Sequence, residues 1–567
     1  MPAFRMRIRA LLLSLSLLTL SWVSPSLAAS EAIVSRVEAL DAGFPVEVLG
    51  KPLFAREALS RFYNAREYQP AWHSPIARRQ LIEAVNAVSR EGLSPEDYHV
   101  TLLTELAYGD IHQHSPELQA DLDMLLSDAF LLLGAHLLDG KVDPHTRQPD
   151  WSVSDQQPHL IKKLATALAT NDVTGELASL RPDHPSYRQL VEARAELTKL
   201  LGRPWLSIPP GDIIRPGDSD DRLLEIRRRL RVLTDLSERE QRSPPVNLGM
   251  YTPEMKPALM TFQARHGLAP DGLIGRHTLE ALNMLPIERV RQIDASLERW
   301  RWLPQSLGDR YVLVNIAGFS LTMVEDGLDV FQQKVIVGQP FRQTPVFSDR
   351  IRYLVLNPTW TIPRKLVIAD QLPRIIRDPG YLDRMDIRVY EGWGSNQRQV
   401  DPATIPWADL TPEEFPYHLI QQPGPQNALG RIKFMFPNRY AVYLHDTPGQ
   451  SLFGRIDRTF SSGCIRVERP FELAEWLMSG DPEWSRGTLD EAVTAQKTQT
   501  VMLPTPVPVY IEYWTAWVDN SGQLQIRSDI YHRDSTLIRA LRQTPSGDGQ
   551  RMTPVYLGMA NDPGEHP

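Results

Sequence analysis

The stretch that decides the fold spans residues 445–467 and reads HDTPGQSLFGRIDRTFSSGCIRV. It begins at His445, which ends an apolar segment, and it places Cys464 19 positions later, after the small residues Ser461 to Gly463. The segment before His445 predicts a β-strand, and a side chain at its end can project from the sheet edge. A helical pattern from Phe471 to Leu477 follows, so the cysteine lies in a turn between extended and helical segments.

Cys464 is the only cysteine among 567 residues, so no intramolecular disulfide can form. A lone thiol is either a small buried hydrophobe or a functional group. The Ser-Ser-Gly sequence before it offers backbone access and no apolar cover, which favours a functional group. A thiol with a pKa near ~8.5 is a weak nucleophile at neutral pH, but a neighbouring imidazolium lowers that pKa. We therefore expect Cys464 to be a nucleophile and His445 its base.

The same turn is a candidate oxyanion hole. The amides of Gly463 and Cys464 are expected to point at a developing oxyanion, with Ser462 in the same loop. Losing one such donor typically costs about 2.7–4 kcal/mol of transition-state stabilisation. One cysteine without a close histidine pair offers too few ligands for zinc. We therefore expect neither a metal nor a cofactor.

Strand periodicity begins after Arg310 and predicts a mostly β catalytic domain over residues 310–500. The strands are expected at Tyr311–Ile316, Leu321–Val324, Val330–Val337, Ile351–Leu356, Ile432–Phe436 and Tyr440–Leu444. Between about 364 and 422 the strand pattern lapses into segments with Pro and Trp, and loops of this length are often functional. We interpret this part as an inserted lid. Residues 501–567 are expected to be a C-terminal extension.

The part before the catalytic domain is predicted to be helical. Residues 45–202 form a helical scaffold domain in this interpretation, and a segment rich in Pro and Gly at 203–217 marks its boundary. A small helical module follows at 206–290, with Thr278 expected to cap its last helix. The expected fold is thus a multidomain α+β protein.

The first residues indicate export. Residues 1–28 combine three Arg and no acidic residue with an apolar run and Ala28-Ala29, which is typical of a signal peptide and predicts a periplasmic location. An uncleaved segment would instead anchor the protein in the inner membrane, and this alternative stays open. Cleavage would change the net charge from −8 to −11, which disfavours nucleic acid as a partner.

Two sets of motifs resemble known families. Residues 262–268 (FQARHGL), 271–275 (DGLIG) and 278–279 (TL) resemble the common peptidoglycan-binding repeat, although a helical spacer without a ligand is the alternative. His445 followed by SSGCIRV resembles the L,D-transpeptidase catalytic domain, the YkuD-like family. Together with 357–363 (NPTWTIP) and 424–430 (GPQNALG), the chain is similar to large Gram-negative members with a scaffold domain, a wall-binding domain and a lid.

This resemblance implies a reaction. Cys464 would attack the carbonyl of diaminopimelate in a tetrapeptide stem, expel the terminal D-Ala and form a thioester that the amine of a second stem resolves. His445 would move the proton, its ring oriented by a backbone carbonyl near Asp446. Arg466 would either hold a substrate carboxylate or brace the loop, and Trp360 and Asn427 are expected in substrate binding. The implied partners are stem peptides as donor and acceptor, glycan strands and other cell-wall synthesis enzymes, and carbapenems would acylate the cysteine.

Two positions depart from the family pattern. Many members have His where Ser462 stands, which puts any role for a second imidazole in doubt, and Glu468 replaces a frequent small amide. Three other functions remain open on the sequence. The same acyl-enzyme resolved by water would make a carboxypeptidase or endopeptidase, an inactive domain would leave a wall-binding structural protein, and another acceptor would attach a lipoprotein to the wall.

Overall fold

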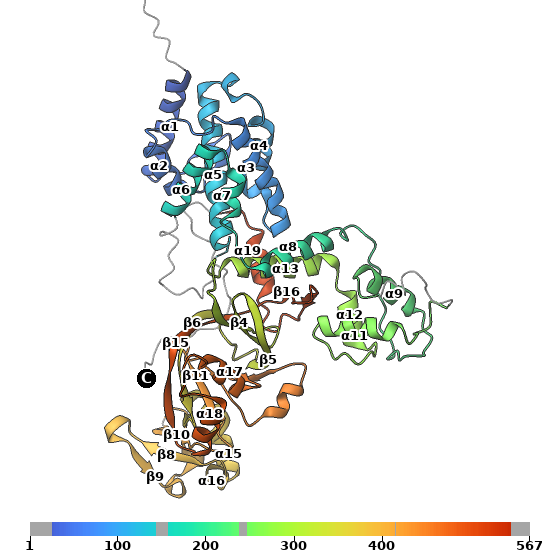
Figure 1. Cartoon of the computed structure of the whole chain (residues 1–567), viewed down its shortest axis with the longest axis vertical. Coiled ribbons are helices and arrows are strands. Elements are labelled where there is room, and N and C mark those ends of the chain that lie inside the picture. The colour runs from blue at the N-terminus through green and yellow to red at the C-terminus, as the bar shows by residue number, and fades with distance from the viewer. Residues whose placement is uncertain (1–24, 143–156, 237–246, 414, 546–567) are drawn as a thin grey trace, which may run out of the picture.

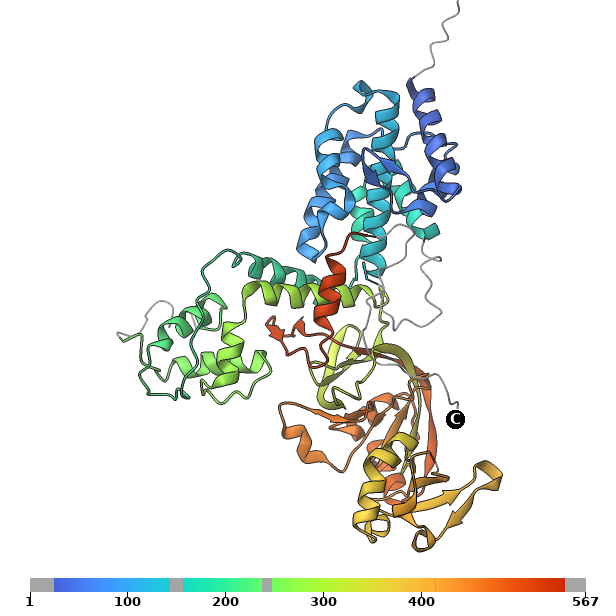
Figure 2. The same ribbon diagram turned by 180° about the vertical axis from the view of Figure 1, so that it is seen from behind.

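The computed structural model describes residues 25–142, 157–236, 247–413 and 415–545 (Figure 1). A helical domain occupies one end, a mostly β domain the other, and a small helical module projects sideways from their junction (Figures 1 and 2). The expected multidomain α+β fold is confirmed. Most of the expected signal peptide lies outside the described residues. Among the described helices, none has the length and apolar character that a membrane crossing requires.

The helical domain is built around α5 (Pro116–Asp139), which is buried along most of its length. Ser115 caps this helix by accepting a hydrogen bond from the Leu118 amide at 3.3 Å. The other helices are α1 (Pro25–Asp41), α2 (Arg56–Asn64), α3 (Pro75–Ala87), α4 (Val100–Leu106), α6 (Gln157–Thr170) and α7 (Val173–Ala178). Ile33 and Val37 of α1 are fully buried in the same core, so the domain begins before the expected residue 45.

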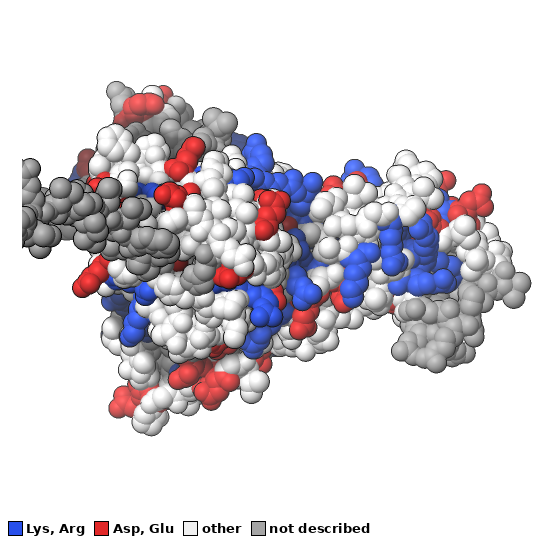
Figure 3. Space-filling model, turned by 90° about the horizontal axis from the view of Figure 1, so that it is seen from above, with Lys and Arg blue, Asp and Glu red and all other residues white. Residues whose placement is uncertain are grey.

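The small module contains α9 (Arg222–Val232), α11 (Met255–Arg265) and α12 (Arg276–Asn283). It is held between α8 (Pro185–Thr198) and α13 (Pro286–Arg301), the long helix at the junction of the three parts. On the face seen in Figure 3, Lys and Arg side chains gather over the arm that carries this module, and α9 has the exposed Arg228 and Arg231.

The repeat-like motif of this module, residues 262–279, is stabilised by hydrogen bonds of the Gln263 side chain. Its side-chain amide donates to Asp271 Oδ1 at 3.0 Å and to Thr278 Oγ1 at 3.2 Å, and its oxygen accepts the Gly272 amide at 2.9 Å. Thr278 was expected to cap α12, but Gly275 occupies the N-cap position. Thr278 Oγ1 instead donates to the Leu273 carbonyl at 3.2 Å, because its side chain faces the preceding turn.

The catalytic domain is a nine-stranded sheet in the order β13-β5-β14-β12-β11-β6-β15-β3-β4. Its strands are β3 (Arg310–Asn315), β4 (Ser320–Glu325), β5 (Leu328–Gly338), β6 (Phe347–Leu356), β11 (Ile432–Met435), β12 (Leu444–His445), β13 (Thr459–Ser461), β14 (Ile465–Val467) and β15 (Gln499–Glu512). A further pairing of β4 with β5 closes the sheet on itself. Helices α17 (Pro470–Leu477) and α18 (Arg486–Thr494) contribute Leu473, Leu477 and Leu489 to its core.

Strand β15 lies between β6 and β3, in the interior of the sheet. The expected domain end at residue 500 therefore falls inside a central strand, and the catalytic sheet continues to Glu512. The chain then forms the hairpin β16 (Ala516–Val518) and β17 (Leu524–Ile526) and helix α19 (Asp534–Leu541), which packs against α13. Arg299 of α13 binds Asp534 at 2.7 Å, so the C-terminal segment ties the domains together.

The expected lid is a folded subdomain with its own core. It begins at β7 (Trp360–Thr361) and includes a four-stranded antiparallel sheet in the order β7-β10-β8-β9, formed with β8 (Ile387–Glu391), β9 (Arg398–Val400) and β10 (Tyr417–Gln421). Helices α14 (Arg364–Leu366), α15 (Leu372–Arg377) and α16 (Tyr381–Arg384) and a π-helical turn at Val367–Gln371 precede β8. The expected lapse of strand structure here is wrong, because β8 pairs with both β9 and β10 and buries Val389 beside Leu419 in the core of the subdomain.

The central position of β15 predicts that its buried side chains are needed for stability. Ile511 is fully buried in the sheet core, whereas Met502 on the same strand is 63% exposed. We expect Ile511→Ala to destabilise the catalytic domain by roughly 2–5 kcal/mol, because it leaves a cavity. The matched control Met502→Ala should change stability by about 0.5 kcal/mol or less. Urea unfolding followed by tryptophan fluorescence measures both, and equal effects would contradict the central placement of β15.

Candidate active site

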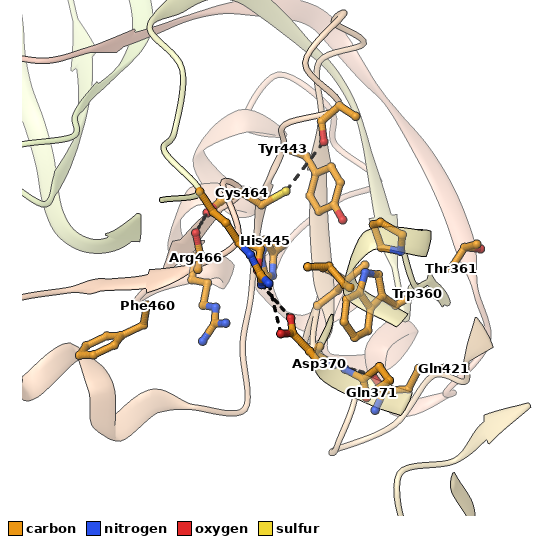
Figure 4. Close-up of a pocket in the computed structure, with 18 of the residues that line it drawn as sticks. Trp360, Thr361, Asp370, Gln371, Gln421, Tyr443, His445, Phe460, Cys464 and Arg466 are labelled. Atoms are coloured by element: carbon orange, nitrogen blue, oxygen red, sulfur yellow. Dashed lines mark hydrogen bonds and ion pairs between the residues drawn. The ribbon is translucent and has the colours of Figure 1, made fainter. Parts of the chain in front are cut away.

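Three neighbouring strands bring the expected residues together. β11 and β12 are antiparallel with Lys433 opposite His445, and β12 and β14 are parallel with His445 opposite Arg466. The Ile465 amide donates to the Tyr443 carbonyl at 3.1 Å, which places Tyr443 beside Cys464 just before the paired residues. The side chains of Lys433, Tyr443, His445, Cys464 and Arg466 line one cavity of about 830 Å³. Figure 4 shows His445 between Arg466 and Phe460 on one side and Trp360 on the other.

His445 is buried and neutral. Its Nδ1 lies 2.5 Å from the carbonyl oxygen of Asp446, the orientation expected from the sequence, and a ring that donates from Nδ1 has Nε2 as its proton acceptor. Burial and, after it, the charges of Arg466 and Lys433 lower the pKa of His445 to about 3, against the opposing effect of the Asp446 and Leu429 carbonyls. We expected an imidazolium to activate the thiol. This expectation is wrong for the resting site, because burial and two flanking cations keep the ring neutral.

Cys464 is half-buried, and its Sγ lies 3.8 Å from the Ala441 carbonyl oxygen. Burial raises the pKa of the Cys464 thiol, while the Tyr443 amide and hydroxyl and the charges of Lys433 and Arg466 oppose this shift. The resting site thus pairs a thiol with a neutral imidazole, and in the described structure no hydrogen bond joins the two. Proton transfer has to accompany substrate binding in such a site.

The carbonyl that contacts Cys464 comes from a turn that the sequence predicted to be a strand. Only Leu444 of the expected Tyr440–Leu444 strand belongs to β12. The Asn438 side chain donates to the Phe436 and Val442 carbonyls at 2.6 and 2.7 Å and accepts the Tyr440 amide at 3.0 Å. These contacts satisfy backbone groups that would otherwise pair with a neighbouring strand, so the chain forms a turn. Within this turn Ala441 adopts a φ of +52°.

The turn before the nucleophile is braced by internal hydrogen bonds. Ser461 Oγ accepts the Gly463 amide at 3.1 Å, so this amide is not available as the expected oxyanion donor. The Cys464 amide remains a proposed donor. Gly463 has a φ of +117°, and its carbonyl accepts from Thr344 Oγ1 at 2.8 Å. Tyr531 of the C-terminal segment donates to the Gly338 carbonyl at 2.5 Å, and Gly338 donates to Thr344 Oγ1.

The lid contacts this turn through Arg342. Its guanidinium binds Asp370 of the lid at 2.7 and 3.2 Å and donates to Ser462 Oγ at 3.0 Å. Trp360 lines the cavity together with Tyr443, which keeps it a candidate for substrate binding. Asn427 does not line the cavity. It is buried, and its side chain bonds the Pro358 carbonyl, the Gln422 carbonyl and the Leu429 amide, so it braces the loop and the expected substrate contact is wrong.

Sequence reasoning missed Lys433, Tyr443, Arg342 and Asp370. Lys433 alternates with Ile432 and Phe434 in a predicted strand, a pattern that indicates a solvent-facing side chain. In the structure that face lines the cavity, because the lid covers it. Asp370 lies in the lid and Arg342 in the loop after β5, so only folding brings them together. No group of side chains suited to a metal ion was found among the described residues.

A cysteine and a fixed neutral imidazole in a covered cavity define a candidate site for cysteine-dependent acyl transfer. Residues 309–489 match the family described as L,D-transpeptidase catalytic domain (YkuD), 57–193 match the "Scaffold domain", and 219–282 match the "Putative peptidoglycan binding domain". The chain therefore carries the catalytic domain of the YkuD L,D-transpeptidase family together with a scaffold and a peptidoglycan-binding domain. These domains indicate a cell-wall or periplasmic location.

Proteins similar to this chain in sequence or in structure are described as L,D-transpeptidases. A Haemophilus influenzae protein described as "Putative L,D-transpeptidase" is 34% identical over 272 residues, which is 47% of this chain and 54% of that protein, so the chain spans about half the length of this relative. A solved L,D-transpeptidase from Stackebrandtia nassauensis aligns at 14% identity with a TM-score of 0.21, covering 54% of this chain and 96% of its own. One from Xylanimonas cellulosilytica aligns at 15% identity with a TM-score of 0.17, covering 54% and 99%.

The Arg342–Asp370 contact predicts a latch between the lid and the nucleophile turn. Both side chains are partly exposed, so the pair should be worth about 1 kcal/mol or less. We expect Arg342→Ala to speed amide exchange in residues 364–377 by up to about fivefold, as that energy allows. Hydrogen–deuterium exchange with mass spectrometry measures this. Arg398→Ala, which breaks an exposed pair with Glu391 within the lid, is the control, and equal exchange in both variants would argue against a latch.

The neutral imidazole predicts a distinct pH dependence. Because Cys464 is the only cysteine, iodoacetamide labels it alone, and its rate should still be rising above pH 8.5, since burial raises the thiol pKa. A labelling rate that has already reached its plateau below pH 7 would instead indicate an imidazolium–thiolate pair.

The same histidine should affect stability. In the unfolded chain His445 has its ordinary pKa of 6.5, whereas in the native protein it stays unprotonated down to about pH 3. Its contribution to stability is therefore complete above about pH 6.5 and is lost as the pH falls from there toward 3.

Proposed function

We propose that this protein is an L,D-transpeptidase that cross-links the diaminopimelate residues of two peptidoglycan stem peptides through a thioester on Cys464. The observation that supports this most is the placement of a neutral, oriented imidazole on β12 and of the thiol just before the parallel strand β14, where both line one cavity beside the lid. The match of residues 309–489 to the L,D-transpeptidase catalytic domain supplies the reaction class.

The first half-reaction would transfer the acyl group to the enzyme. Nε2 of His445 takes the thiol proton as Cys464 Sγ bonds to the donor carbonyl carbon, and the negative charge moves to the carbonyl oxygen near the Cys464 amide. Collapse of this intermediate breaks the C–N bond, and the leaving amine takes the proton from the imidazolium. The imidazolium beside Lys433 and Arg466 is unstable, which makes His445 a strong acid for this step.

The second half-reaction would return the enzyme to its resting state. An amine of a second stem bonds to the thioester carbon and gives its proton to His445, the C–S bond breaks, and the thiolate recovers that proton. Residues of the lid line the cavity and would limit the access of water to it, which would favour an amine acceptor over hydrolysis. The basic side chains over the module's arm would attract the carboxylates of stem peptides and hold the enzyme near glycan strands.

A purified disaccharide-tetrapeptide tests this proposal. The wild type should yield a cross-linked dimer that has lost one terminal D-Ala, together with an acyl-enzyme detected by intact-protein mass spectrometry. Cys464→Ala should lose turnover below detection, because no nucleophile remains, while circular dichroism and the melting temperature stay unchanged. A product consisting of tripeptide alone would favour a carboxypeptidase, and loss of folding in Cys464→Ala would favour a structural thiol.

A further inference from the structure

The turn between β8 and β9 of the lid carries an exposed tryptophan. Trp393 is 69% exposed, although one face of its indole stacks on His418, with the ring centres 4.0 Å apart and the ring planes 14° from parallel. His418 is 5% exposed, and on its other side it lies beside Tyr390, its partner across the strands, at 5.6 Å. Burial lowers the pKa of His418, so its ring is neutral. We call these three side chains the aromatic platform.

The turn holds Trp393 in place. Gly392 has a φ of +75°, and a Cβ atom there would come within 2.6 Å of the Asn396 carbonyl oxygen, because the backbone passes close to itself. The Asn396 amide donates to the Trp393 carbonyl and the Gln397 amide to the Gly394 carbonyl, both at 3.2 Å. A ring that is fixed in this way loses little conformational freedom when a ligand covers it. The open face of the indole is therefore suited to bind a flat surface.

The surroundings of the aromatic platform indicate a neutral ligand with hydroxyl groups. Residues 392–397 carry no charge, and Asn396 and Gln397 among them offer exposed amide groups. Arg398, which follows, pairs with Glu391. A stable protein interface needs about 800 Å² on each partner, far more than the face of one indole. A sugar ring has an apolar face that can cover the indole, and its hydroxyl groups can bond to the amides.

The lid sheet connects the aromatic platform to the catalytic cavity, with β8 and β9 at the outer end of the domain (Figure 1). Ile387, at the start of β8, and Gln421, at the end of β10, both line the cavity. His418 lies on β10 about 10 Å from Gln421. In the proposed donor, the stem residues up to the scissile bond span at most about 11 Å when extended. A stem that reaches Cys464 would thus bring its glycan strand to the outer part of the lid sheet.

We propose that the aromatic platform binds a sugar ring of the glycan strand that carries the donor stem. This rests on the proposed acyl transfer at Cys464 and adds a second point of attachment to it, on the lid. Binding there would hold the lid over the donor, because the platform and the cavity-lining residues of the lid belong to one sheet. The enzyme would then prefer stems on a glycan strand to free peptides, independently of the peptidoglycan-binding domain.

Matched donors test the aromatic platform. A tetrapeptide stem on a tetrasaccharide and the same free tetrapeptide differ only in the glycan. We expect Trp393→Leu, which still covers His418, to lower kcat/KM for the tetrasaccharide donor by roughly 3- to 10-fold, the usual effect of an aromatic stacking contact, and to leave the free peptide unaffected. Trp393→Phe keeps a flat ring and should retain most of the preference. Phe44→Ala, at a 64% exposed aromatic side chain near the helical domain, should behave as wild type.

Two outcomes of this comparison would overturn the aromatic platform. An equal loss of rate with both donors in Trp393→Leu would show that the indole only supports the fold of the lid. An unchanged rate with both donors would show that no sugar covers the indole during the reaction.

A binding measurement separates the aromatic platform from the chemistry. Cys464→Ala cannot turn over a donor, and chitotetraose, a neutral chain of N-acetylglucosamine, should shift one indole N–H signal in its NMR spectrum. That signal is the one missing when Trp393→Phe is added, so a sugar bound at the peptidoglycan-binding domain cannot be mistaken for it. A signal that does not move would overturn the platform and leave a protein partner as the occupant of the turn. A shift in Cys464→Ala, when the wild type forms no acyl-enzyme, would support the platform and overturn the proposed reaction.

Discussion

The parallel pairing of β12 with β14 is the constraint on which the rest of the site depends. It sets His445 beside Arg466 and leaves Cys464 at the entrance to β14. A parallel pair cannot be joined by a tight hairpin, so the chain needs a crossover between the two strands. Residues 446–464 supply it, and the spacing between His445 and Cys464 follows from this topology. The brace of Ser461, Thr344 and Gly338 then holds the end of the crossover against β5.

Electrostatics rather than a preformed ion pair prepares this site. Burial between two cations keeps the resting His445 neutral, which leaves its Nε2 free of a proton, and burial also keeps the thiol protonated. The same cations favour the thiolate once the proton leaves, because both stand near the sulfur. An anionic substrate group would change this balance by neutralising part of the positive charge. A negative charge placed beside these cations would therefore shift the pKa of both the imidazole and the thiol.

The domains depend on one another through buried polar contacts. Helix α13 links the module, the helical domain and the C-terminal segment, and Glu298 on it accepts the Val142 amide at 2.6 Å. Tyr531, in the segment after β15, reaches back to the turn that supports Cys464. Within the module, the motif residues Gln263, Asp271 and Thr278 bond mainly to one another. These side chains therefore hold the module's own turn in place.

The sequence by itself determined the parts that local pattern encodes. Strand periodicity predicted β3 to β6 and β11, and the motif around Cys464 indicated the family and predicted the candidate nucleophile and its histidine. The helical pattern from Phe471 to Leu477 likewise predicted α17. These features depend on residues close together along the chain, so their physical causes can be recognised without a fold.

Only the tertiary structure decided how distant segments meet. The sequence pattern around Lys433 is that of a surface strand, but in the folded protein the lid covers this face of the strand. Arg342 and Asp370 are far apart in sequence, and only the fold of the lid brings them into contact. Residues after 500 were expected to be an extension because β15 carries no motif, yet two strands far away in sequence enclose it. The charge state of His445 likewise depends on burial and on cations from neighbouring strands. Solvent exclusion and cross-strand neighbours are properties of the assembled sheet, so no local pattern along the chain could encode them.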